Sequence, residues 1–218
     1  MNVSSASSKN PKVRLAILIL AAGEGSRLGG YPKALLKKDG STLLKRFIYS
    51  IQEFDPVETL VVTGFYSDEI ESEILSIQKR VKNSLTWIKN RNPEAGQSSS
   101  VRLGLESLQS DYDVLLIALC DQPNVGAQEI KSLLEQFNQR ELKQEIVLPI
   151  VNGRRGNPVL FSRGVIQRVL AIPEMVCRPF MDKHPELVKD FDTSNNAFIL
   201  DADTKGDIQK LGLDKIKP

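Results

Sequence analysis

The chain has 218 residues, and its 29 Lys and Arg against 27 Asp and Glu leave a formal net charge of +2. This near-equal number of positive and negative charges gives no argument for a nucleic-acid or membrane partner. The longest apolar run, residues 15–22, is too short to cross a bilayer. Two cysteines and one histidine exclude a disulfide scaffold and argue against a zinc cluster. Because no export signal is visible, we expect a cytoplasmic globular protein that works with carboxylates, amines, guanidinium groups and backbone.

The chain begins with a predicted tail. Residues 1–12 are rich in Ser, Asn and Lys and contain no apolar run, so they bury nothing and we expect them to be disordered. From residue 13 onward, short apolar runs alternate with helical patterns. The runs predict strands over residues 13–20, 59–63, 85–88, 114–119 and 146–150.

Helical spacing of apolar residues marks the segments between these strands. The spacing i, i+3, i+4, i+7 predicts helices over residues 44–51, 70–77, 101–108 and 130–137. Alternation of this kind predicts an α/β protein with three layers, α/β/α, in which helices cover both faces of a mostly parallel, Rossmann-like sheet.

After about residue 151 the alternation loosens. Residues 158–161 and 198–200 are expected to form strands, and residues 164–170 and 206–211 are expected to form helices. No linker separates this part from the rest. We therefore predict that residues 13–218 form a single domain with an elaborated C-terminal third.

The most informative stretch, residues 20–33, follows the first predicted strand and reads LAAGEGSRLGGYPK. Ligands of open α/β sheets bind beyond the carboxyl ends of the strands, and glycine-rich backbone can approach them closely. Arg27 and Lys33 add two cations, and a triphosphate needs this combination of charge and N–H donors. The loop is not a Walker A loop, because Gly-Lys-Ser/Thr is absent, and Leu28 replaces the third glycine of the dinucleotide fingerprint.

Two later segments follow predicted strands in the same way. Residues 92–105 join a strand to a helix, where Gly96 permits close approach and the serines at 98–100 offer donors or helix caps. Asp121 follows the strand 114–119 and is a hard oxygen ligand suited to Mg²⁺ beside phosphates. Capping of the next helix is the alternative role for this aspartate.

Together these motifs resemble the nucleotidyltransferases with a Rossmann-like fold, and especially their molybdenum cofactor cytidylyltransferase branch. The resemblance implies that the first loop wraps a triphosphate and that the serine segment borders the base and ribose. It implies catalytic roles for Arg27, Lys33 and Asp121. The nucleotide-binding residues that it implies are Leu20, Ala21, Ala22, Gly23, Gly25, Arg27, Lys33, Gly96, Ser98, Ser99 and Asp121.

A further match lies near the expected acceptor site. Residues 153–158 resemble the Gly-x-x-Gly-His-Pro segment of the family, with Asn157 where histidine is usual. The resemblance implies that Arg154, Arg155, Gly156 and Asn157 bind the acceptor, while the two arginines also suit an exposed basic turn. A weaker match aligns residues 177–178 with a Gly-Ala-Arg segment of the family.

The last match concerns the metal. Residues 201–207 resemble the family ending Asp-x-Asp-Thr-Pro-Glu-Asp, in which Asp203 corresponds to the second metal ligand. The resemblance therefore implies that Asp121 and Asp203 bind Mg²⁺ as the cofactor. Asp201 and Asp207 also suit a surface turn and a helix cap.

The function that the resemblance implies is transfer of CMP from CTP to the terminal phosphate of molybdopterin, with release of pyrophosphate. Ala22 favours CTP, because guanylyl-transferring relatives carry a second glycine at this position. One alternative is a nucleotidyltransferase that uses GTP or UTP, or a sugar-phosphate acceptor. The other is a non-catalytic chaperone that binds the cofactor, and transient contact with a molybdoenzyme or its chaperone is expected.

Overall fold

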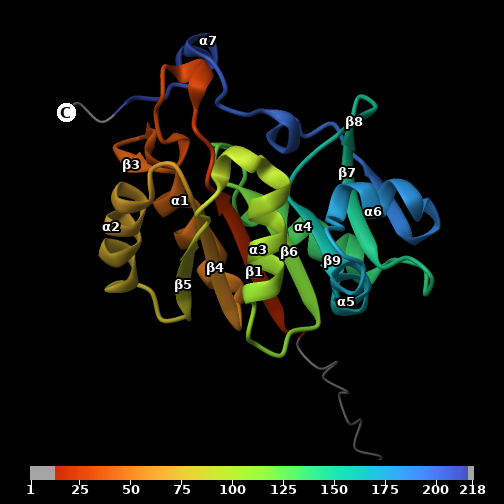
Figure 1. Cartoon of the computed structure of the whole chain (residues 1–218). Coiled ribbons are helices and arrows are strands. Elements are labelled where there is room, and N and C mark those ends of the chain that lie inside the picture. The colour runs from red at the N-terminus through yellow and green to blue at the C-terminus, as the bar shows by residue number, and fades with distance from the viewer. Residues whose placement is uncertain (1–12, 216–218) are drawn as a thin grey trace, which may run out of the picture.

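The computed structural model describes residues 13–215, so the tail predicted for residues 1–12 lies outside the described residues. At its centre is a sheet with the order β10-β7-β9-β6-β1-β4-β5, in which β8 pairs with β7 (Figure 1). The strands of this sheet are β1 (Leu15–Ala21), β4 (Glu58–Thr63), β5 (Leu85–Lys89), β6 (Val114–Leu119), β7 (Ile146–Val151), β8 (Arg154–Arg155), β9 (Val159–Ser162) and β10 (Val188–Asp192). A separate short hairpin joins β2 (Lys37–Lys38) to β3 (Ser41–Thr42).

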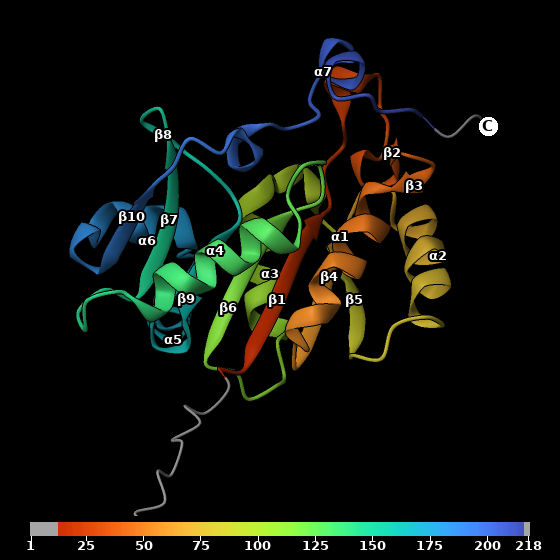
Figure 2. The same cartoon turned by 180° about the vertical axis from the view of Figure 1, so that it is seen from behind.

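Helices cover both faces of the sheet. They are α1 (Leu43–Ile51), α2 (Ser67–Gln78), α3 (Gln97–Ser107), α4 (Ala127–Asn138), α5 (Arg163–Ala171), α6 (Cys177–Lys183) and α7 (Lys205–Lys210). In β1, Ile17 and Ile19 pack with α1, α2 and α4, whereas Ala16 and Leu18 pack with α3, α5 and α6. Figure 1 shows α3 and α5 in front of the sheet, and Figure 2 shows α1 and α4 in front of its other face. Alternate residues of a strand face opposite sides, so β1 is covered on both. This confirms the predicted three-layer α/β/α fold.

Four of the seven strand pairs in the main sheet of residues 13–215 are parallel, and the chain order reverses at β1. β4 and β5 lie on one side of β1 and β6 lies on the other, all in parallel. β9 runs antiparallel between β6 and β7, and β10 is parallel to β7. Such a reversal leaves a crevice beyond the carboxyl ends of the two central strands. The loops after β1 and β6 therefore meet at one edge.

The structure corrects the prediction of a strand at residues 198–200. Asn196–Ile199 form a 3₁₀ turn instead, because the side chain of Asn195 accepts a hydrogen bond from the Ala197 N–H at 2.9 Å and caps the turn. The other predicted strands and helices are present. The short strands β2, β3 and β8 lack a sequence prediction. So do the edge strand β10, which is only partly buried, and α6, which has Pro179 in its first turn. No helix within residues 13–215 is long and apolar enough to span a membrane.

Glu58, the first residue of β4, holds the loop after α3. Its Oε2 accepts hydrogen bonds from the Ser110 N–H at 2.8 Å and the Gln109 N–H at 3.1 Å. Glu58→Ala removes this acceptor, so we expect the free energy of unfolding in urea to fall by about 1–3 kcal/mol. Glu58→Gln keeps one acceptor and should lose less. Turnover should not change, because this loop lies at the amino ends of the strands; an unchanged urea midpoint in Glu58→Ala would contradict the account.

Candidate active site

The loop after β1 is a fixed turn. Gly25 has a φ of 64°, in the left-handed region that favours glycine, and a Cβ there would overlap the Tyr31 carbonyl oxygen. The Gly25 carbonyl accepts hydrogen bonds from the Leu28 N–H at 2.9 Å and the Gly30 N–H at 3.1 Å. Leu28 is 1% exposed and anchors the loop in a small apolar cluster. The turn brings Lys33 back over the end of the sheet.

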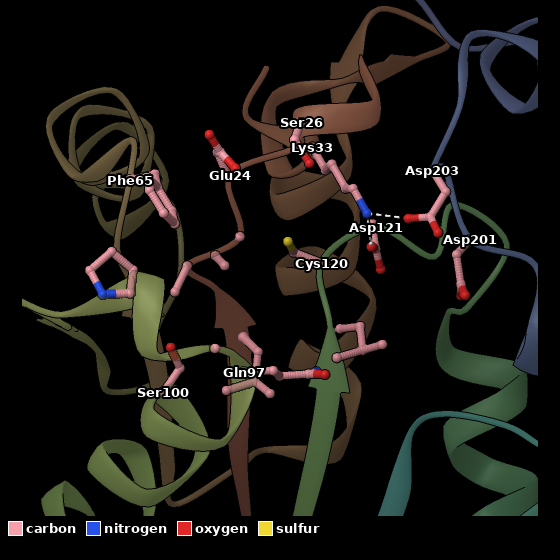
Figure 3. Close-up of a pocket in the computed structure, with 18 of the residues that line it drawn as sticks. Glu24, Ser26, Lys33, Phe65, Gln97, Ser100, Cys120, Asp121, Asp201 and Asp203 are labelled. Atoms are coloured by element: carbon pink, nitrogen blue, oxygen red, sulfur yellow. Dashed lines mark hydrogen bonds and ion pairs between the residues drawn. The ribbon is translucent and has the colours of Figure 1, made fainter. Parts of the chain in front are cut away.

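Lys33 lies between the two aspartates that are the expected metal ligands. Its ammonium donates to Asp121 Oδ2 at 2.9 Å and also to Asp203 Oδ1 (Figure 3). Arg27 donates to Asp203 Oδ2 at 2.7 Å. Burial lowers the pKa of Lys33, but the charge of Asp121 and the hydrogen bonds to both carboxylates outweigh it, so the pKa is raised above its usual range. Lys33 therefore stays charged and ties the loop to both carboxylates.

Ala202 brings the C-terminal segment to the end of β6. It is fully buried, and its N–H donates to the Asp121 carbonyl oxygen at 2.9 Å. Asp201 and Asp203 flank this anchor, so both lie beside Asp121. Asp207 has the expected role of a helix cap, since its Oδ2 accepts a hydrogen bond from the Thr204 N–H at 2.8 Å.

Asp201 lies in the wall of the cavity at this edge, and not in a surface turn as the sequence suggested. Its Oδ1 is buried and has no hydrogen-bond partner. Burial, and then the charge of Asp121, raise the pKa of Asp201 to about 6. The segment therefore contributes a second carboxylate to the cavity wall beside Asp203.

The carboxylates at this edge fit a divalent cation. Oδ1 of Asp121 is buried without a hydrogen-bond partner, so this hard oxygen atom is free to act as a metal ligand. Mg²⁺ is usually held by one or two carboxylates together with substrate phosphates. Within residues 13–215, no group of three or more His, Cys, Asp or Glu side chains is placed to hold a metal by itself. Asp121 and Asp203 therefore suit a cation that arrives with phosphates.

These residues open on a cavity of about 470 Å³. The nucleotide-binding residues expected from the sequence that line it are Leu20, Ala21, Ala22, Gly23, Gly25, Arg27, Lys33, Gly96 and Asp121. Ser98 lines a second cavity instead. The hydroxyl of Ser99 is turned toward the backbone, where it donates to the Gly96 carbonyl oxygen at 2.8 Å. Gln97 and Ser100 line the first cavity in their place.

Asn90, which the sequence analysis did not single out, holds the start of α3. It is 6% exposed, and its Nδ2 donates to the hydroxyls of Ser99 at 2.8 Å and Ser100 at 2.9 Å. Its Oδ1 accepts a hydrogen bond from the Asn92 N–H at 2.9 Å. The signal in the sequence is a polar residue directly after β5, at the carboxyl edge of the sheet. Asn90 therefore positions Ser100 in the cavity wall.

We expect Asn90→Ala to raise the KM for the nucleotide by about tenfold, or about 1.4 kcal/mol, and to leave kcat nearly unchanged. The reason is that the serine hydroxyls lose their common donor while the groups around the phosphates stay in place. Steady-state kinetics of pyrophosphate release measure both constants. Asn83→Ala is the matched control, because Asn83 hydrogen-bonds Asp55 at 2.9 Å at the amino end of β5. A loss confined to kcat would contradict this role.

A second cavity of about 610 Å³ adjoins the first, and Leu20, Gln97 and Leu119 line both. The expected acceptor residues that line it are Arg154, Arg155, Gly156 and Asn157. Arg155 also donates to Asp182 of α6 at 2.5 Å, and Arg178 in the first turn of α6 lines the same cavity. Strand residues such as Phe161 give the cavity an apolar wall. The structure thus brings all the predicted nucleotide residues except Ser98 and Ser99 to the first cavity, and the four predicted acceptor residues to the second, which adjoins it.

The fold and these paired cavities define an α/β protein with room for a nucleotide beside a second substrate. The family model for the MobA-like NTP transferase domain matches residues 17–187. The chain therefore belongs to the MobA-like NTP transferase family.

Curated relatives agree with this family, and solved structures share its fold. The chain is 32% identical over 161 residues to a probable molybdenum cofactor guanylyltransferase from Bacillus mycoides, which covers 73% of this chain and 74% of the relative. It is 31% identical over 137 residues to another from Bacillus cytotoxicus, and this match spans 63% of the length of each protein. Rv0371c from Mycobacterium tuberculosis H37Rv has a TM-score of 0.71 at 19% identity, over 91% of this chain and 97% of that one. A manganese complex of the same protein gives a TM-score of 0.64 at 18% identity, over 91% of this chain and 97% of that one, and this likeness shows the fold.

Proposed function

We propose that this protein transfers a nucleoside monophosphate from an NTP to the terminal phosphate of a molybdopterin-type acceptor and releases pyrophosphate. The observation that carries the proposal is the bridge from Lys33 to Asp121 and Asp203 at the wall of the glycine-loop cavity. Cations suited to a triphosphate and carboxylates suited to a metal meet at this point. The names of the two Bacillus relatives support the molybdopterin-type acceptor.

In this reaction an oxygen of the acceptor phosphate attacks the α-phosphorus of the NTP. A phosphorus–oxygen bond forms there, and the bond from the α-phosphorus to the bridging oxygen of the β-phosphate breaks. The acceptor phosphate is already ionised at neutral pH, so no general base is needed. The thiol in the cavity is not a nucleophile, because burial raises the pKa of Cys120 far above neutral pH.

The residues of the cavity act by charge and position. Arg27 and Lys33 bind the phosphates and offset the charge that develops on the leaving pyrophosphate. Asp121 and Asp203 would hold Mg²⁺, which when bound supplies further positive charge to the phosphates. The glycine loop adds backbone N–H donors. Positioning and electrostatic stabilisation then supply most of the rate.

The acceptor would bind in the second cavity. Arg154 and Arg178 offer positive charge to its phosphate, and the apolar wall suits a flat ring system. Because Leu20 and Leu119 line both cavities, the two substrates bind side by side. Asn157 cannot become cationic, so it binds the acceptor through neutral hydrogen bonds.

We propose CTP as the nucleotide and GTP as the second candidate. Ala22 lines the cavity. The resemblance of the loop implies a glycine at this position in guanylyl-transferring relatives, so the methyl group of Ala22 favours the smaller pyrimidine. GTP is favoured by the names of the Bacillus relatives.

A panel of the four NTPs, scored for pyrophosphate release with molybdopterin and with sugar phosphates, tests the proposal. We expect release with CTP and molybdopterin. Strict dependence on GTP would overturn CTP as the nucleotide substrate and establish GTP in its place. Release with only a sugar phosphate would overturn the acceptor. Tight binding of nucleotide with no release for any acceptor would indicate a cofactor-binding chaperone instead.

A further inference from the structure

Phe65 is a large apolar side chain that is left exposed at the wall of the nucleotide cavity. It lies after β4, is 43% exposed and lines the same cavity as Lys33. Figure 3 shows its ring on the side of the cavity away from Lys33, Asp121 and Asp203. The cavity therefore has a charged end and an aromatic end.

The backbone on both sides of Phe65 is fixed to the glycine loop. Gly64 packs so closely that a Cβ there would lie 2.6 Å from the Ala22 carbonyl oxygen. The Gly64 carbonyl accepts a hydrogen bond from the Ser67 hydroxyl at 2.7 Å, and the Tyr66 hydroxyl donates to the Glu24 carbonyl at 2.9 Å. Both neighbours of Phe65 are thus anchored, so the backbone that carries the exposed ring is held at the cavity wall.

An aromatic ring at this end suits the part of the nucleotide that the charged groups do not contact. Every nucleobase has a flat π face, and its stacking on an aromatic side chain is favourable whichever base it is. Figure 3 places Ser100 on the same side of the cavity, where its hydroxyl can face the edge of a base. The distribution of groups matches a nucleoside triphosphate from end to end.

We propose that Phe65 is the platform on which the base of the bound NTP stacks. The proposal rests on the proposed function, because it assigns the base end of the same nucleotide. Stacking reads no hydrogen-bond pattern, so the platform supplies affinity, and the choice of base falls to the polar groups of the cavity.

The test measures equilibrium binding of CTP, GTP and inorganic tripolyphosphate by calorimetry in the presence of Mg²⁺. Phe65→Ala is expected to raise the Kd of the nucleotide that the wild type binds by about tenfold and to leave the Kd of tripolyphosphate unchanged. Phe65→Tyr keeps the ring and should bind like the wild type. Tyr49→Ala is the matched control, because Tyr49 is 38% exposed on α1 and does not line the cavity.

Three results would overturn the platform. An unchanged nucleotide Kd in Phe65→Ala shows that the ring does not stack, and an equal loss for tripolyphosphate shows a general distortion of the cavity. A wild-type protein that binds neither nucleotide overturns the proposed function and the platform with it. Only this last result concerns the function itself.

Fluorescence gives a second readout that does not require the alanine variant to fold. The chain has one tryptophan, Trp87, so Phe65→Trp combined with Trp87→Phe leaves a single tryptophan, at the platform, whose emission can be excited selectively. A stacked base should quench it, and tripolyphosphate should not. Equal spectra with CTP, GTP and tripolyphosphate would count against the platform.

Discussion

Asp121→Ala is expected to lower turnover by at least about 100-fold, the size of loss that follows removal of an electrostatic stabiliser. The side chain is 16% exposed, its Oδ2 accepts from Lys33 at 2.9 Å, and its Oδ1 has no partner. Bulk water therefore cannot replace its charge. The fold should persist, because Ala202 is held by the Asp121 carbonyl oxygen rather than by the carboxylate.

Two companion variants separate charge from shape. Asp121→Asn keeps the shape of the side chain and should lose turnover almost as severely as the alanine variant. Asp68→Ala is the matched control, since the Asp68 side chain is 93% exposed and should be dispensable. Pyrophosphate release gives the rates and urea unfolding gives the stability. Wild-type turnover in Asp121→Ala would remove this residue from the catalytic set.

Lys33→Met is expected to lower turnover by about 10²–10³-fold and to increase the affinity for a divalent metal ion. The ammonium contacts both Asp121 and Asp203, so it competes with a divalent cation for the same oxygens. Removal of the ammonium frees the two carboxylates and weakens the binding of phosphates. Without nucleotide, Mn²⁺ should therefore bind more tightly to the variant than to the wild type, as measured by electron paramagnetic resonance.

The two readouts of Lys33→Met move in opposite directions, which a general loss of structure cannot produce. Lys143→Met is the control, because the Lys143 side chain is 70% exposed and pairs only with Glu141 among the ion pairs of residues 13–215. Weaker binding of Mn²⁺ to Lys33→Met would show that the lysine supports the metal site instead of competing for it.

Strong local patterns made the central fold predictable from the sequence. β1 and β6 are nearly continuous apolar runs because both their faces are covered, and the apolar stripe of α1 has regular helical spacing. β10 escaped prediction because an edge strand buries little and needs no apolar run. The turn at Phe198 resembles a strand by composition, but the Asn195 cap, a local hydrogen bond, decides its conformation.

The site was predictable as a set of motifs and not as a geometry. The positions of the loop after β1 and of Asp121 follow from the βα order, because each comes directly after a parallel strand at the same edge of the sheet. The bridge from Lys33 to Asp203 does not, since it depends on how residues 201–203 return over the sheet. Phe65 and Asn90 were missed because a single aromatic or amide carries no motif, and only the packing around each shows where it points.

The return of residues 201–203 also has a consequence for biosynthesis. Lys33 and Asp203 are 170 positions apart, and Arg27 and Asp203 are 176 apart. On the ribosome, the glycine loop and β1 emerge early, whereas Asp203 emerges only after nearly all of the sheet has been made. A nascent chain that ends before Asp203 contains Arg27 and Lys33 but lacks one of their two carboxylate partners. Unfinished chains therefore cannot form the contacts of Arg27 and Lys33 with Asp203, and the centre is completed only late in synthesis.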